Sequence, residues 1–209
     1  HAEKNNPRGV EVCSPGSEWK TYYEKTQKNC QNCHMPETAG HVSHNFSGTH
    51  QGDLLQKAVD MQLNFSRSKR KVSITLKNSG AGHAIPTGTP LRMVILKVTG
   101  LDANGKKIWE NWKENPMKED CTGLFMKILG DAEGNAPVPP WRATQIIYDR
   151  RLMPGVPEIV KYEIRNENVR QIQATLIYRF APYPILQKFN IADPEFTQPK
   201  LLAHKELKI

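Results

Sequence analysis

The sequence has no apolar run long enough to cross a bilayer, and it has neither a glycine-rich phosphate-binding loop nor a nucleophile-elbow turn. Aromatic residues make up only 8 % of the chain, and no aromatic pattern typical of RNA-binding modules is present. We therefore predict no transmembrane segment and no nucleic-acid partner. The sequence also offers no motif for phosphate binding or for nucleophilic hydrolysis.

Cysteine is scarce, and four cysteines in 209 residues are too few for a disulfide scaffold. A chain of this length can bury a hydrophobic core without such cross-links. Cys13 and Cys121 stand alone in the sequence, and in an oxidising compartment they form a candidate disulfide. The other two cysteines lie three positions apart.

These two cysteines belong to the stretch Cys30-Gln31-Asn32-Cys33-His34, which is a complete c-type haem attachment motif. The two thiols can each form a thioether with a vinyl group on one edge of a porphyrin. The histidine that follows can place a ring nitrogen on the iron as the proximal ligand. The motif predicts one covalent haem c, attached through Cys30 and Cys33 and ligated by His34.

The same two cysteines could instead form a redox dithiol or half of a zinc site. A thioredoxin-like dithiol expects a βαβ context, whereas the residues around Cys30 are polar and no apolar strand precedes them. A zinc site expects a second pair of close ligands, and the remaining cysteines are single. The sequence therefore favours haem attachment.

Three histidines are candidates for the second axial position: His50, His44 and His83, in that order. His44 and His50 follow His34 closely enough for the chain to pass round the edge of the ring, so His34 and His50 are the predicted metal ligands. His83 lies in the loop 80–88, where glycines allow a close approach of the backbone and Pro86 stiffens the exit. A methionine ligand or an open position is the remaining alternative.

The hydrophobic period changes near residue 68. Before it, we expect a short helix at 18–28 and an amphipathic helix at 51–63, where apolar residues recur at close to 3.6-residue spacing. After it, apolar residues alternate in segments separated by turn signals, which predicts strands at 72–76, 93–98, 108–112, 124–129, 146–148, 159–164 and 172–180. A short helix at 183–189 and an irregular tail after residue 193 complete the prediction. The predicted class is α+β: a small α-helical, loop-rich haem module at 1–67 and an antiparallel, Ig-like β-sandwich at 68–209.

The formal net charge is +8, from 29 Lys and Arg against 21 Asp and Glu. Such a charge can steer an acidic redox partner towards the protein. The chain begins at His1 without the apolar segment of a signal peptide, and covalent haem attachment takes place outside the bacterial cytoplasm. We therefore expect a mature chain that is periplasmic or extracellular.

Several stretches resemble the recurring sequence motifs of bacterial multihaem c-type cytochromes related to the tetrahaem cytochromes of nitrification. They are residues 29–36, Gly40-His41, Ser43-His44-Asn45-Phe46, Gly48-Thr49-His50, Gly82-His83 and Pro86-Thr87-Gly88. The resemblance implies bis-histidine haems and a β-rich domain after the haem-bearing region. Where those cytochromes carry a further complete motif upstream, this chain has the single Cys13, which implies a relative reduced to one haem.

The favoured function is electron transfer by a monohaem c-type cytochrome, as a subunit or docking partner of a larger redox assembly. The expected partners are redox proteins, with other cytochromes among them, and an electron carrier is favoured over an enzyme. A haem enzyme or gas sensor with an open distal site is the second hypothesis. A secreted β-sandwich binding module without haem is the third.

Overall fold

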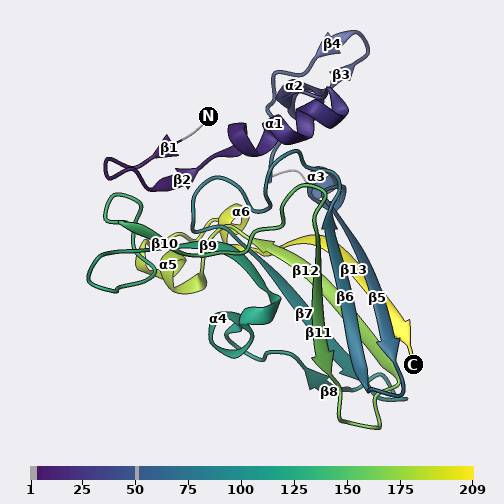
Figure 1. Ribbon diagram of the computed structural model, residues 1–209. Helices are drawn as coiled ribbons and strands as arrows, with labels where there is room; N and C mark the ends of the chain where they lie inside the picture. The colour runs from purple at the N-terminus through teal and green to yellow at the C-terminus, as the bar shows by residue number, and fades with distance from the viewer. Residues whose placement is uncertain (1–3, 50–51) are drawn as a thin grey trace.

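Antiparallel β-structure dominates the computed structural model, which describes residues 4–49 and 52–209 (Figure 1). Strands make up 38 % of the chain and helices 19 %. The predicted α+β class, with a helical haem module in front of an Ig-like sandwich, is therefore wrong. The error lies mainly before residue 68, where a strand replaces most of the expected long helix.

The strands from Val59 onward form two sheets, and two short two-stranded sheets precede them. The larger sheet has the order β10 (Gln145–Asp149), β9 (Leu124–Gly130), β7 (Met93–Leu101), β12 (Gln171–Arg179) and β13 (Lys200–Lys208), and β8 (Lys107–Glu110) also pairs with β7. The smaller sheet has the order β11 (Pro157–Glu163), β6 (Lys71–Asn78) and β5 (Val59–Ser66). All of these pairings are antiparallel. Residues of both sheets share one buried cluster, so the two sheets pack face to face.

Alternating apolar side chains explain most of these strands. In β6, Val72, Ile74 and Leu76 are fully buried between the sheets. β7 is apolar without alternation because both of its faces are covered: Val94 faces the shared core, whereas Met93 belongs to a second cluster on the opposite face. Each of the seven segments that we expected to be strands overlaps an observed strand.

β5 stands where the long helix was predicted. Only α3 (Gly52–Gln56) is helical there, and the strand begins at Val59. Val59 and Met61 are buried while Asp60 is exposed, and Met61 pairs with Leu76 of β6. Burial against a neighbouring strand therefore outweighs the helical spacing of the apolar residues.

Short helices connect or cover the strands: α4 (Pro116–Glu119), the 3-10 turn Cys121–Gly123, α5 (Tyr183–Lys188) and α6 (Pro194–Thr197). α5 confirms the helix expected at 183–189. The prediction of an irregular tail is wrong, because β13 pairs with β12 from Lys200 to Lys208 and buries Leu202.

The N-terminal segment lies at one end of the two sheets (Figure 1). It contains β1 (Lys4–Asn5) and β2 (Glu11–Cys13), α1 (Pro15–Thr26), α2 (Cys30–His34), and a hairpin of β3 (Glu37–Thr38) and β4 (His41–Val42). Proline in its first turn favours the start of α1, and Gln27 ends it in the left-handed region at φ 57°. No apolar residue between positions 15 and 49 is buried, so this segment has no hydrophobic core of its own.

Candidate haem-binding site

The attachment motif forms the whole of α2. Asn29 caps this turn reciprocally with Asn32: the Asn29 side chain accepts from the Asn32 backbone N–H at 3.0 Å, and the Asn32 side chain accepts from the Asn29 backbone N–H at 2.8 Å. Cys30 and Cys33 are three residues apart and therefore share a face of the turn. Both are free thiols, Cys30 exposed and Cys33 half-buried. The local sequence thus presents two thiols side by side without help from a core.

His34 is held by the segment that follows the β3–β4 hairpin. Its Nδ1 makes a short hydrogen bond with the carbonyl oxygen of Ser47, and the Ser47 N–H donates back to the His34 carbonyl at 3.0 Å. The ring of Phe46 stacks on the imidazole, with centroids 4.6 Å apart and planes at 11°. Because a carbonyl oxygen can only accept, the imidazole proton lies on Nδ1. In the neutral ring of this tautomer, Nε2 carries a lone pair, as in metal-ligating histidines whose other nitrogen is tied to a carbonyl.

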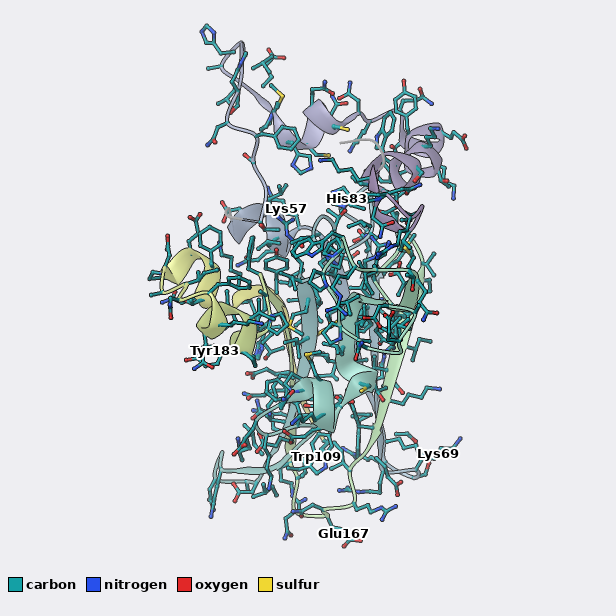
Figure 2. The ribbon with its side chains drawn as sticks, turned by 90° about the vertical axis from the view of Figure 1, so that its left-hand side faces the viewer. Lys57, Lys69, His83, Trp109, Glu167 and Tyr183 are labelled. Carbon is teal, nitrogen blue, oxygen red and sulfur yellow. The ribbon has the colours of Figure 1, made fainter. Side chains whose placement is uncertain are left out.

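His83 is held in the same way by the loop between β6 and β7. The buried Asn78 side chain donates to the carbonyl oxygens of His83 at 2.8 Å and Leu152 at 2.9 Å, which fixes the loop. His83 Nδ1 lies 3.0 Å from the Ala84 carbonyl oxygen, so Nε2 of this ring is free too. Burial lowers the pKa of His83, against a smaller raising effect of the Ala84 carbonyl, so the ring is neutral at pH 7. Figure 2 shows His83 at the end of the sheets that the N-terminal segment covers.

The rings of His34 and His83 lie close to each other although 49 positions separate them in the sequence (83 − 34 = 49). Their centroids are 6.1 Å apart and their planes are within 10° of parallel. Two histidines therefore meet at the junction of the N-terminal segment and the sheets, each with Nδ1 bound to a carbonyl and with no partner of Nε2 among residues 4–49 and 52–209.

α1 is fastened to the His83 loop by a buried ion pair. Glu18 accepts from Arg151 Nη1 at 2.8 Å, and the two side chains are only 7 % and 8 % exposed. The other oxygen of Glu18 accepts from the Ala84 backbone N–H at 2.9 Å. Tyr22 packs directly on Gly82, where an added Cβ would lie 2.6 Å from the tyrosine ring. These contacts set the position of α1, and hence of the motif that follows it, relative to His83.

Among the described residues, the other candidates His44, Cys13 and Cys121 form no hydrogen bond with these two histidines. His44 is exposed, and it forms no hydrogen bond with any residue that the structure describes. His50 lies outside the described residues. Cys13 and Cys121 are both free thiols, so the predicted bridge between them is not formed. Within residues 4–49 and 52–209, no group of three or more His, Cys, Asp and Glu is arranged to hold a metal ion.

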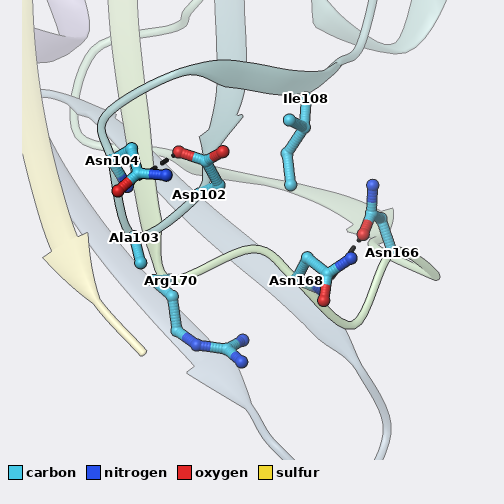
Figure 3. Close-up of a pocket in the computed structure, with 7 residues that line it drawn as sticks. All are labelled: Asp102, Ala103, Asn104, Ile108, Asn166, Asn168 and Arg170. Carbon is cyan, nitrogen blue, oxygen red and sulfur yellow. Dashed lines mark hydrogen bonds between the residues drawn. The ribbon is translucent and has the colours of Figure 1, made fainter.

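Two open cavities lie at the surface of the described residues, and one of them is next to the attachment motif. One, of about 430 Å³, lies beside α2 and is lined by residues that include Gln31, Asn32 and Met35. The other, of about 310 Å³, is shown in Figure 3. It lies among the loops that contain Asp102 and Asn166, and their side-chain oxygens accept backbone N–H groups of their own turns. None of the predicted site residues lines this second cavity.

Sequence reasoning missed the residues that position the two histidines. Glu18 and Arg151 are charged residues in unremarkable context, and their contact spans 133 positions, so no local pattern could reveal it. Gly82 did carry a signal, because a glycine next to a candidate ligand predicts the close approach of another group. The group proves to be the ring of Tyr22.

The fold is like that of a multihaem c-type cytochrome. The chain is similar to the crystal structure of a penta-heme cytochrome c552 from Thermochromatium tepidum, with a TM-score of 0.89 and 33 % sequence identity. The similarity covers 100 % of this chain but 54 % of that protein, so the chain spans about half the length of its relative. This confirms the expected resemblance to multihaem c-type cytochromes. The narrower relation to the tetrahaem cytochromes of nitrification stays a prediction.

The other comparisons are negative: no family model matches the sequence, and no curated protein does. In the part of the chain that the structure describes, no helix is long and apolar enough to span a membrane.

Proposed function

We propose that the chain carries one covalent haem c and transfers electrons. Cys30 and Cys33 form the thioether bonds, and His34 and His83 are the two axial ligands of the iron. The similarity to a penta-heme cytochrome supports a haem c in this chain. The number of haems and the choice of ligands are argued from this chain's own residues.

The observation that carries the proposal is the separation of the two imidazoles. A ring nitrogen lies about 1.2 Å from the ring centre and binds a metal at about 2 Å, so two imidazoles on opposite sides of one metal have centres about 6.4 Å apart. The rings of His34 and His83 are 6.1 Å apart and nearly parallel. Each has its Nδ1 bound to a backbone carbonyl, which leaves Nε2 for the iron. The separation of the two ring centres therefore matches that of two imidazoles on one iron.

The lack of a core in residues 15–49 supports the same conclusion. Large apolar side chains of this segment are exposed, among them Tyr23 at 37 %, Val42 at 52 % and Phe46 at 61 %. Such surface is costly to leave in water, at about 25 cal/mol per Å². A porphyrin held by α2 supplies an apolar group of the size that this segment lacks.

When bound, haem supplies an iron that changes its oxidation state by one electron. The chain's part is to keep the ligands still: Ser47 holds the His34 ring, and Ala84 and Asn78 hold His83 and its loop. Little rearrangement is then needed between the oxidised and reduced states. We further propose that the chain works outside the bacterial cytoplasm with other redox proteins, and that its charge of +8 favours an acidic partner.

The test is the visible absorption spectrum of the oxidised and reduced protein, with carbon monoxide added to the reduced form. We expect sharp low-spin bands that carbon monoxide leaves unchanged. His83→Ala should convert them to a high-spin spectrum that responds to carbon monoxide, whereas the matched control His44→Ala should resemble the wild type.

Other outcomes would contradict the proposal in distinct ways. A wild-type spectrum that shifts with carbon monoxide would favour a haem enzyme or gas sensor with an open distal site. A His44→Ala spectrum that changes while that of His83→Ala does not would move the axial position to His44. No haem absorption at all would favour a binding module without haem.

A further inference from the structure

Four side chains of the described residues have a buried polar atom without a hydrogen-bond partner: Thr87, Arg92, Tyr178 and Arg179. Three of these atoms, Thr87 Oγ1, Arg92 Nε and the hydroxyl of Tyr178, belong to neighbouring residues at one end of the sheets. Tyr178 as a whole is only 2 % exposed. Buried polar groups without partners are rare in proteins, because each one has given up its water. A cluster of them indicates a place for a polar ligand.

Arg92 is held in a fixed position within this cluster. Its Nη1 donates to the Thr87 carbonyl oxygen at 2.9 Å, and its guanidinium lies over the ring of Phe180, 5.3 Å from the ring centre. Gly88, at φ +90°, allows this close packing, because a Cβ there would lie 2.9 Å from Nη1. Contacts of the chain thus fix the guanidinium through Nη1 and its ring stacking and leave Nε unused.

Tyr178 adjoins the same guanidinium. Burial raises the pKa of the Tyr178 phenol, and the charge of Arg92 and the side chain of Thr49 lower it to a smaller extent. The sheet register places Tyr178 and Arg92 together: Tyr178 pairs with Val94, two residues after Arg92, and the Arg92 guanidinium lies over Phe180, two residues after Tyr178. The Tyr178 hydroxyl itself has no hydrogen-bond partner among the described residues. The Arg92 guanidinium therefore joins two hydroxyl-bearing residues, Thr87 through its carbonyl and Tyr178 across the sheet, and a positive charge beside hydroxyl donors suits an anion with several acceptor oxygens.

The cluster lies between the two segments that hold the axial histidines. Thr49 is two residues from Ser47, whose carbonyl binds His34, and two residues span at most about 7 Å. Thr87 is in the same loop as His83, four residues further on (87 − 83 = 4). A haem carries two propionates on the edge of the porphyrin opposite its thioether bonds, so a carboxylate site is expected beside a ring that is held between the two axial ligands.

We infer that Thr87, Arg92 and Tyr178 form a carboxylate-binding site that takes a propionate of the haem. The inference rests on the proposed function. Arg92 offers Nε for a charge-assisted hydrogen bond, and the two hydroxyls complete the site as neutral donors. The site would neutralise one negative charge of the haem.

The test compares Arg92→Gln and Tyr178→Phe with the wild-type haem protein. The first readout is the propionate bending band in the resonance Raman spectrum, which responds to hydrogen bonds at the propionates. We expect this band to shift in both variants. The second readout is the reduction potential, which should fall in Arg92→Gln, because a positive charge near the iron favours the reduced state, and should recover towards the wild-type value in Arg92→Lys.

Arg179→Gln is the matched control. Arg179 follows Tyr178 in β12 and also has a buried Nε without a partner among the described residues, but it faces the opposite side of the sheet. We expect its Raman band and its potential to equal those of the wild type. If Arg92→Gln does not fold, Tyr178→Phe still tests the carboxylate site. The Tyr178→Phe change removes a single oxygen that makes no hydrogen bond within the described chain, so this variant should fold.

A propionate band that stays unchanged in Tyr178→Phe and in folded Arg92→Gln would overturn the inference and leave the proposed haem function intact. An equal fall of the potential in Arg179→Gln would also overturn it, because the effect would then be one of general charge. A wild-type protein without covalent haem would overturn both proposals.

Discussion

Replacing Glu18 by glutamine should weaken the attachment of α1 to the sheets. Glu18 accepts from Arg151 at 2.8 Å and from the Ala84 N–H at 2.9 Å, and its side chain is 7 % exposed. Glutamine keeps the shape and can still accept from Ala84, so the loss is one charge-assisted hydrogen bond, worth roughly 1.5–3 kcal/mol. Arg151 retains two hydrogen bonds to Asp149, at 2.7 and 2.8 Å. The cost therefore stays below the roughly 3–5 kcal/mol of leaving a buried charge unpaired.

A loss of about 2 kcal/mol corresponds to about a thirty-fold increase in the opening of this contact. Hydrogen exchange measures such opening, and the Ala84 N–H reports it directly because Glu18 is its acceptor. In Glu18→Gln, we expect the protection of Ala84 and of the backbone of α1 to fall at least tenfold.

The matched control is Glu158→Gln. Glu158 pairs with Arg150 at 3.2 Å, but these side chains are 33 % and 25 % exposed, and pairs of this kind contribute roughly 0.2–1 kcal/mol. Exchange in α1 should not change in this control. If α1 exchanges at the same rate in Glu18→Gln and Glu158→Gln, the ion pair does not position α1 and the reasoning fails.

Two further predictions concern neighbouring residues. Burial raises the pKa of Asp149, but hydrogen bonds and charge from Arg151 outweigh it, and the net pKa lies below the ordinary value of 3.8. A lowered folded-state pKa gives stability that is complete above the unfolded value and is lost as the pH falls through the folded one. Asp149→Asn should therefore flatten the acid loss of stability below about pH 4 in urea titrations, and a slope equal to that of the wild type would contradict this. Gly82→Ala should displace the ring of Tyr22 and lower the protection of α1 against hydrogen exchange. Gly48→Ala is the control, because nothing lies within 4 Å of the new Cβ, and it should leave the protection of α1 unchanged. Equal protection in the two variants would show that the contact with Tyr22 does not position α1.

The sequence predicted the strands after residue 68 because alternation is a local property. The alternation of Val72, Ile74 and Leu76 predicts a half-buried strand, whichever element it packs against. The same rule was available for β5, where Val59, Met61, Leu63 and Phe65 alternate, but several of these residues also fit helical spacing. β13 was missed because only Leu202 is buried along it, so its assignment depends on pairing with β12.

The residues of the site also fall into a part that the sequence predicted and a part that it did not. The two thiols and the proximal histidine are contiguous, so the motif names them without any knowledge of the fold. The choice among His44, His50 and His83 depends on which loop the sheets bring to α2, and neither spacing nor composition determines that. The carboxylate site was out of reach for the same reason, because Arg92 and Tyr178 come from different strand ends and only their lack of partners marks them.

Because the N-terminal segment has no hydrophobic core, a stability measurement on this chain reports mainly on the two sheets. Ordering a residue costs roughly 1–2 kcal/mol of backbone entropy, and residues 15–49 bury no apolar side chain that would offset it. Thermal or denaturant transitions therefore follow the two sheets and are insensitive to most substitutions between α1 and Thr49. Sequence drift in this segment is limited by the chemistry of its ligands and by its few anchors, such as Glu18 and Tyr22, and not by the folding of the protein.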